Sequence, residues 1–233
     1  MSKYSIPHHQ LIESVLNNFN ADFFCENNVI FGGGTRIALE LSEFRESNDI
    51  DLLCPNRESY RAIRDQVTNV TLGSIVKSDF TYIRDIRADR DAVRTVIKNH
   101  KTPIKVEFIS FDNYELVSCF DDKVFPIPFL DKTSCFYTKL LANADRKLVA
   151  PYKDIFDILA MYKSWGSIPS EAIILAEKHY GKRVVVPSLI EALEDIVRDP
   201  STYERSAKNV TMKSDWIEDI IFKYPQMLLL ELK

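Results

Sequence analysis

The pattern of apolar and polar positions divides the chain into a mixed N-terminal part and a helical C-terminal part. Helical spacing of apolar residues predicts helices at residues 8–20, 35–44, 57–68, 133–147, 151–164, 169–179, 187–198 and 214–230. Short apolar or β-branched runs predict strands at residues 28–31, 48–54, 93–98 and 103–111. The order of these elements predicts an α+β protein, in which a strand-containing N-terminal unit precedes a C-terminal helical bundle.

A proline-punctuated segment separates the two parts. Residues 121–132 include Pro126 and Pro128 and lack a periodic pattern. Because proline interrupts both helices and central strands, this segment is expected to connect two units. We therefore predict one domain over residues 1–128 and a helical bundle domain over residues 129–233.

The segment between residues 84 and 111 allows two interpretations. The turn-like residues Asn99–Thr102 between two β-branched runs favour a hairpin. A helix over residues 89–99 is the alternative, because basic side chains recur there at spacings of three and four, namely at Arg84, Arg87, Arg90, Arg94, Lys98 and Lys101. On a helix, this basic stripe would form a surface suited to binding RNA. On a hairpin it is a set of solvated edge-strand charges, which is the interpretation we favour.

Composition narrows the class of protein. The chain has 233 residues, 45% of them hydrophobic, and a formal net charge of −4, so no global basic field attracts nucleic acid. The four cysteines are scattered without a Cys-x-x-Cys pair, which disfavours a zinc site and suits a reducing cytoplasm. No signal peptide pattern and no apolar run long enough for a bilayer occur, so a cytoplasmic location without membrane contact is expected.

Candidate chemistry is concentrated between residues 31 and 53. A glycine turn, Gly32–Gly34, opens a helical pattern, and a short strand then places Asp49 and Asp51 on one face. Two adjacent carboxylates repel each other unless a cation lies between them. Mg²⁺ would supply that cation, with substrate phosphates completing its shell. Glycine backbone N–H groups at a helix start can approach such phosphates.

This block resembles the nucleotidyltransferase superfamily related to DNA polymerase beta, and most closely its AbiEii/AbiGii-type toxin branch. The branch pattern is Gly-Gly-Thr, a helix, then Arg-x-Ser-x-Asp-Ile-Asp-Leu. The matching residues are Gly33, Gly34, Thr35, Arg45, Ser47, Asp49, Ile50, Asp51 and Leu52. The resemblance implies a nucleotidyltransferase-fold mixed sheet with flanking helices. It also implies that Gly33, Gly34, Thr35, Arg45 and Ser47 contact the nucleotide.

The family mechanism uses three carboxylates and two metal ions. In the strand that begins near Ile104, the apolar side chains alternate with Lys105 and Glu107. Glu107 is our candidate for the third metal-binding carboxylate, beside Asp49 and Asp51, and for the base nearest the acceptor hydroxyl. An exposed strand glutamate that pairs only with Lys105 is the structural alternative.

A second block resembles the toxin family's Lys-Leu-x-Ala, Arg and Lys/Arg-Asp-x-x-Asp pattern. It runs from Lys139 through Arg146 to Asp157. By resemblance, Lys139 binds the nucleotide phosphates, and Asp157 positions that lysine or a metal-bound water. Ordinary pairing of Lys153 with Asp157 along one helix is the alternative.

Three residues of the first block have structural alternatives as well. Thr35 could cap the helix that it opens. Ser47 could bond an aspartate backbone or a phosphate, and Arg45 could pair with a carboxylate.

The resemblance implies a metal-dependent enzyme that transfers a nucleoside monophosphate from an NTP to a hydroxyl. Mg²⁺ or Mn²⁺ would be the cofactor, the 3′ end of tRNA the expected acceptor, and a cognate antitoxin protein the partner. One alternative is transfer to a small molecule such as an aminoglycoside, or to a protein side chain. Another is a nucleotidyltransferase-fold module that binds partners without turnover.

Overall fold

The structure is a computed structural model that describes residues 2–99 and 102–233. Its helices are α1 (Pro7–Asn18), α2 (Ala21–Glu26), α3 (Gly33–Glu40), α4 (Arg57–Gln66), α5 (Lys132–Arg146), α6 (Lys153–Trp165), α7 (Ser170–Tyr180), α8 (Val185–Arg198), α9 (Pro200–Asn209), α10 (Ser214–Ile217) and α11 (Tyr224–Leu232), with a 3₁₀ turn η1 (Gly73–Ile75) and a π-helical segment η2 (Glu218–Lys223). Its strands are β1 (Ile30–Gly32), β2 (Asp49–Cys54), β3 (Thr81–Tyr82), β4 (Arg87–Ala88), β5 (Ala92–Asn99), β6 (Thr102–Ser110), β7 (Ser118–Cys119) and β8 (Phe129–Leu130).

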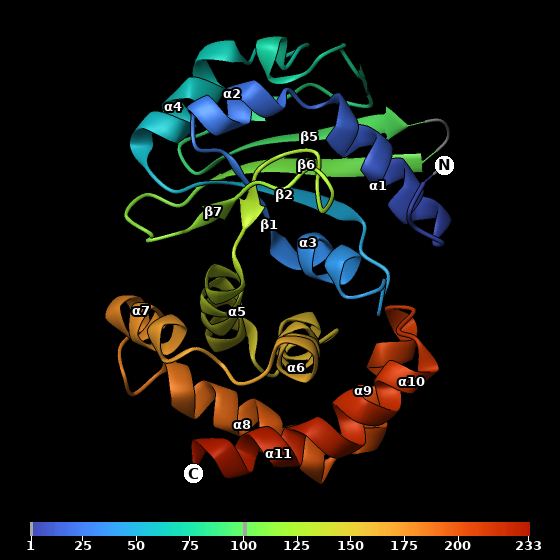
Figure 1. The fold of residues 1–233 in the computed structure, drawn as a ribbon, viewed down its shortest axis with the longest axis vertical. Helices are drawn as coiled ribbons and strands as arrows, with labels where there is room; N and C mark the ends of the chain where they lie inside the picture. Colours follow the sequence, from blue (N-terminus) through green and yellow to red (C-terminus); the bar gives the residue numbers. More distant parts are fainter. Residues whose placement is uncertain (1, 100–101) are drawn as a thin grey trace. The chain divides into compact units, whose positions relative to one another are not determined.

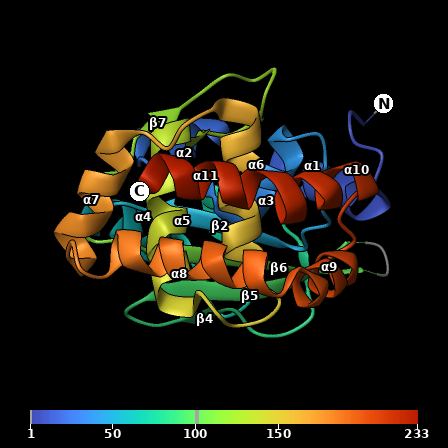
Figure 2. The same cartoon turned by 90° about the horizontal axis from the view of Figure 1, so that it is seen from below.

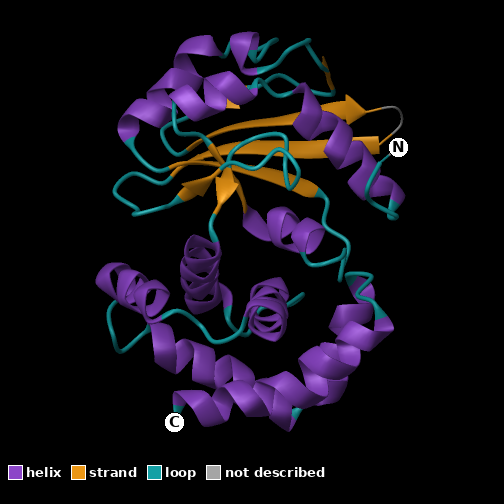
Figure 3. Ribbon diagram, in the orientation of Figure 1, coloured by secondary structure: helices purple, strands orange, loops and turns teal. Residues whose placement is uncertain are grey.

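The chain forms two compact units. The first contains the residues up to Arg36 together with Ser47–Asp131, and the second contains Ile37–Glu46 and Lys132–Lys233. All the strands belong to the first unit, and the second is helical, as the colouring of Figure 3 shows. The predicted α+β fold class is thereby confirmed, whereas the predicted domain boundary stays a prediction. Strand β8, which follows that boundary, pairs with β1 in the sheet.

The sheet of the first unit is mixed and has β2 near its middle. The strand order is β3-β5-β6-β2-β1-β8-β7, and β4 also pairs with β5. Strand β2 runs parallel to β6 and antiparallel to β1. The paired neighbours leave β2 no free edge, so its side chains are held at fixed positions on either face.

The two faces of this sheet differ in chemistry. On one face Phe108 of β6 packs against Phe19 and Phe24, with ring centroids 6.2 and 6.4 Å apart. Figure 1 shows α1, α2 and α4 along this side of the sheet. The alternation of the strands sends Asp51 and Glu107 to the opposite face. The apolar face thus anchors the strands that carry the candidate carboxylates.

The hairpin interpretation of residues 93–111 is confirmed, and the helix over residues 89–99 is wrong. Strands β5 and β6 pair in antiparallel register from Ala92↔Ile109 to Asn99↔Thr102. Of the basic stripe, four side chains are exposed and Arg94 is half-buried; the exposed ones are Arg84, Arg87, Arg90 and Lys98. Lys101 and the predicted turn residue His100 lie outside the described residues.

The second unit is built around α5, which contacts α6, α7 and α8. Helices α8 and α11 lie side by side, as Figure 2 shows. The single helix expected over residues 214–230 is α10, η2 and α11 in succession. Helix α9 was not predicted, because its sequence has few apolar residues. Within the described parts of the chain, no helix combines the length and the apolar character needed to cross a bilayer.

Phe108→Ala is expected to destabilise the first unit by about 3–5 kcal/mol, because it leaves a cavity beneath β6. Phe120→Ala is the matched control, since Phe120 is 54% exposed whereas Phe108 is fully buried. Urea unfolding of the two variants measures the difference. Equal unfolding midpoints would contradict the assignment of Phe108 to the core.

Candidate active site

The glycine turn lies directly against Asp51. Gly33 has a φ of +69°, and a Cβ atom added there would lie 2.1 Å from Oδ2 of Asp51. Gly32 is the register partner of Asp51 between β1 and β2. Only glycine allows both this backbone conformation and this close approach. The turn and the aspartate therefore form one structural feature, which places backbone N–H groups of a helix start beside a carboxylate.

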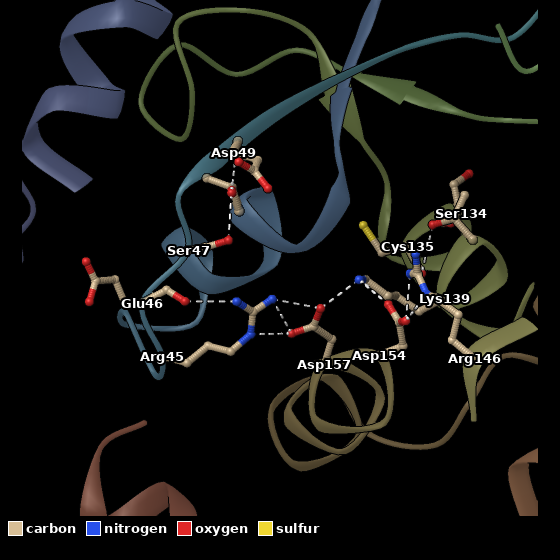
Figure 4. Close-up of polar contacts among 12 residues, drawn as sticks. Arg45, Glu46, Ser47, Asp49, Ser134, Cys135, Lys139, Arg146, Asp154 and Asp157 are labelled. Atoms are coloured by element: carbon tan, nitrogen blue, oxygen red, sulfur yellow. Dashed lines mark hydrogen bonds and ion pairs between the residues drawn. The ribbon is translucent and has the colours of Figure 1, made fainter. Parts of the chain in front are cut away.

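Thr35 and Ser47 fix the beginning of β2. The Thr35 hydroxyl donates a hydrogen bond to the backbone oxygen of Asp49 and lies 2.8 Å from the Ser47 hydroxyl oxygen. Figure 4 labels Ser47 and Asp49 in this segment. Helix α3 begins at Gly33, so Thr35 lies inside the first turn and is not the N-cap. These contacts give Thr35 and Ser47 a structural role that is compatible with nucleotide contact.

His9, which was not among the predicted site residues, supports the same segment. Its Nε2 atom accepts a hydrogen bond from the Ser47 backbone N–H at 3.1 Å, and its side chain is fully buried. An accepting Nε2 requires a neutral imidazole whose proton is on Nδ1. The pair His8-His9 carries no spacing signal that would have predicted this contact.

Glu107 is the register neighbour of Asp51 across β2 and β6. Adjacent strands lie about 4.8 Å apart, so the two side chains leave the sheet side by side. The Glu107 carboxylate forms ion pairs with Arg94, at 3.0 Å, and with Lys105. The predicted pairing with Lys105 is present, and two cations already balance the charge of Glu107.

The Asp49 and Asp51 pair has the donor chemistry of a site for a hard divalent cation. Asp49 is exposed, Asp51 is half-buried, and both project from the same face of β2. Mg²⁺ typically takes one or two protein carboxylates and completes its shell with water and phosphate. Within residues 2–99 and 102–233, no three His, Cys, Asp or Glu side chains are grouped as a metal site. Two aspartates thus fit the ion, whereas Glu107 would first have to leave its cations.

The second unit contains a buried network of charges that begins at Arg45. The Arg45 guanidinium donates to both carboxylate oxygens of Asp157, at 2.8 and 2.9 Å, and both side chains are buried. Such a bidentate pair fixes the orientation of the carboxylate. Asp157 also binds the Nζ atom of Lys139 at 2.7 Å. Asp157 therefore positions Lys139, and the alternative pairing of Asp157 with Lys153 is not observed among the described residues.

Lys139 is also bound by Asp154, which in turn binds Arg146, as Figure 4 shows. The Lys139–Asp154 distance is 2.9 Å and the Arg146–Asp154 distance is 2.7 Å. Three cations, including Arg45, thus face two carboxylates. The network carries one surplus positive charge, which suits an anionic ligand.

These contacts set the protonation of the network. Burial alone lowers the pKa of Lys139, but the carboxylates of Asp157 and Asp154 outweigh burial and raise that pKa above its ordinary value. Burial raises the pKa of Asp154, but Lys139 and Arg146 outweigh it and lower the pKa to about 2. Lys139 is therefore a permanent cation at neutral pH.

Asp154 and Arg146 were not among the predicted site residues. A signal for them exists, because Lys139 and Arg146 are seven residues apart on α5 and Asp154 and Asp157 three apart on α6. These spacings place each pair on one helix face.

The predicted site residues thus form two groups. Gly33, Gly34, Thr35, Ser47, Asp49, Asp51 and Glu107 belong to the first unit, and Arg45, Lys139 and Asp157 to the second. Their roles in binding and catalysis stay predictions.

A family model described as "Nucleotidyl transferase AbiEii toxin, Type IV TA system" matches residues 14–217 of the chain. The chain belongs to the AbiEii nucleotidyltransferase toxin family. The predicted resemblance is therefore confirmed. Membership supports a transferase that acts in a toxin–antitoxin pair, for which a cognate antitoxin is the expected partner.

Solved structures share the fold of this AbiEii family member. A structure from H. pylori, described as that of a candidate nucleotidyltransferase, matches with a TM-score of 0.54 and 14% identity, over 100% of this chain and 97% of the other. JHP933 from Helicobacter pylori matches with a TM-score of 0.51 and 13% identity, over 100% of this chain and 94% of the other. A search of the curated proteins found no match.

Gly33→Ala is expected to abolish nucleotidyl transfer, because the added methyl group displaces the Asp51 carboxylate. Gly166→Ala is the matched control: Gly166 has a φ of +92° but nothing within 4 Å of an added Cβ. Each variant carries backbone strain on the order of 1–3 kcal/mol, because a side chain is disfavoured at both φ values. Transfer assays compare them. Equal activities would show that the position of Asp51 does not depend on Gly33.

Asp154→Asn is expected to lower the free energy of unfolding by about 2 kcal/mol at pH 7, as the lowered pKa implies. Asp154 has its ordinary pKa of 3.8 when unfolded and a pKa of about 2 when folded. Its stabilising contribution is therefore complete above about pH 4 and is lost as the pH falls through about 2. Urea unfolding across this range measures it, with Asp122→Asn, at an exposed position, as the control. If the difference in free energy of unfolding between the wild type and Asp154→Asn stayed constant at acid pH, the ionised Asp154 carboxylate would not be its cause.

Proposed function

We propose that this AbiEii family member transfers a nucleoside monophosphate from an NTP to a hydroxyl of RNA, with tRNA 3′ ends as the expected acceptor. The observation that carries the proposal is the contact between the Gly33 turn and Asp51, with Asp49 on the same strand face. A phosphate-binding turn fused to a carboxylate pair suits a triphosphate that arrives with a divalent cation.

Asp49 and Asp51 would hold Mg²⁺ or Mn²⁺, which supplies charge neutralisation at the phosphates when bound. Gly33 and Gly34 offer backbone N–H groups to the triphosphate. Thr35 and Ser47 keep the start of β2 in place, through the Thr35 hydrogen bond to the Asp49 backbone. These residues orient the nucleotide rather than react with it.

In the transfer step, the acceptor oxygen forms a bond to the α-phosphorus, and the bond from this phosphorus to the bridging oxygen of pyrophosphate breaks. Glu107 is the proposed acceptor of the hydroxyl proton. Its carboxylate forms ion pairs with Arg94 and Lys105 in the structure. The ion pairs also have to rearrange when substrate binds, since they occupy its oxygens.

Lys139 remains the proposed phosphate ligand of the second unit, with Asp157 and Arg45 as the residues that position it. The surplus positive charge of their network supports this role. A lysine that has no alternative proton state at neutral pH acts as a fixed point charge.

The test is incubation of the purified protein with each α-labelled NTP, Mg²⁺ and total RNA, followed by separation of the labelled products. Asp49→Asn and Asp51→Asn are each expected to reduce transfer more than about 100-fold, because a bound metal contributes several kcal/mol to the transition state. EDTA should stop transfer, and Mg²⁺ or Mn²⁺ should restore it.

Asp122→Asn is the control for these variants, and circular dichroism checks that each one is folded. Aminoglycosides and protein fractions replace RNA in parallel reactions. Label on one of these acceptors alone would overturn the RNA assignment. Absence of label on every acceptor with all four NTPs, from a folded protein, would overturn the proposed activity.

A further inference from the structure

A basic cavity of about 700 Å³ lies in the first unit, away from the carboxylate pair. Three of its arginines come from α4, namely Arg57, Arg61 and Arg64, and Arg90 comes from the turn before β5. The three positions on α4 are four and three residues apart, so their side chains leave the same helix face. The fold therefore gathers four guanidinium groups around one hollow, in a protein with a net charge of −4.

The charges of this cavity are only partly balanced. Asp112 pairs with Arg57 at 3.1 Å, and Asp91 pairs with Arg90 at 3.3 Å. Four guanidinium groups against these two carboxylates leave two surplus positive charges. Arg61 is exposed and has no ion pair or hydrogen bond within the described residues. An anion can therefore enter the cavity without breaking a buried contact.

The cavity is separate from the candidate active site. Its lining residue Ser110 is paired with Cys54, at the far end of β2, whereas Asp49 is paired with Lys105 at the near end. Five residues of strand span about 16 Å. Stacked nucleic acid has one phosphate per about 3.4 Å of each strand, so a ligand that reaches both places carries several phosphates.

We propose that this cavity binds backbone phosphates of single-stranded RNA, as an anchoring site for the acceptor; this inference rests on the proposed function. The planar guanidinium fork matches phosphate oxygens better than a lysine does. Tyr114 also lines the cavity, and its ring is held edge-on by Phe111 at 4.9 Å. A fixed, half-buried aromatic ring offers a base a stacking surface.

The experiment measures binding without catalysis. Fluorescence anisotropy follows a short labelled single-stranded RNA on the full-length protein, in EDTA and without NTP, over a range of salt concentrations. The test variant is Arg61→Gln with Arg90→Gln. The control is Arg84→Gln with Arg183→Gln, which removes two exposed arginines that do not line the cavity.

The test variant is expected to reduce the slope of log affinity against log salt by about 1.4, since each single-strand phosphate contact contributes about 0.7. At 0.1 M salt this corresponds to about 25-fold weaker binding. The control should bind as the wild type does. An unchanged affinity in the test variant, or an equal loss in the control, would overturn the inference.

Competitors identify the source of the phosphate. Pyrophosphate or ATP that displaces the RNA at equal phosphate concentration would assign the cavity to a small nucleotide instead. If poly-glutamate binds the wild type, loses affinity in the test variant, and RNA does not bind, the cavity would be assigned to an acidic protein. The binding assay contains no NTP, so its result does not depend on transfer. A protein that binds RNA but transfers no label in the labelling assay would overturn the proposed activity. A wild-type protein that transfers label but does not bind RNA in the anisotropy assay would overturn this inference alone.

Discussion

The close approach of the Gly33 backbone to the Asp51 carboxylate is the constraint on which the rest of the first unit depends. It requires a residue without a side chain, with positive φ, directly after β1, and it requires β2 to pair with β1 in one register. A slip of one residue would turn Asp49 and Asp51 toward the apolar face. The packing of Phe108 against Phe19 and Phe24 and the Thr35 hydrogen bond to the Asp49 backbone both oppose that slip. Core packing and site geometry thus stabilise the same register.

In the second unit, ion pairs keep the buried Lys139 side chain charged inside a helical core. A buried ammonium without partners would lose its proton. Asp157 and Asp154 prevent this, and Arg45 and Arg146 keep those carboxylates oriented. Removing one partner from a buried ion pair is costly, although the whole pair contributes little net stability because desolvation offsets its attraction. The geometric consequence of this network is a fixed position for the Lys139 ammonium.

The fold was predictable wherever the pattern had a strong period, and the site only where residues lie close along the chain. Helix α6 and the Asp49–Asp51 strand follow from local spacing. Helix α9 was missed because its apolar positions are few. The recurrence of basic residues every three or four positions suggested a helix where β5 forms, as the alternative to the favoured hairpin. The ion pairs of Glu107 and the role of His9 depend on which distant segments meet. Sequence periodicity carries no such information, because it reports only the environment of one segment.

The net charge of the chain does not describe the local charge around the basic cavity. The overall value of −4 is compatible with four arginines around one cavity, because the Debye length is only about 10 Å at 0.1 M salt. A polyanion within that distance responds to local guanidinium groups rather than to carboxylates elsewhere. The carboxylate pair itself repels phosphate until a cation is bound. With the basic cavity about 16 Å along the sheet, the proposed RNA acceptor would be held by its backbone while its end meets the candidate metal-binding carboxylates.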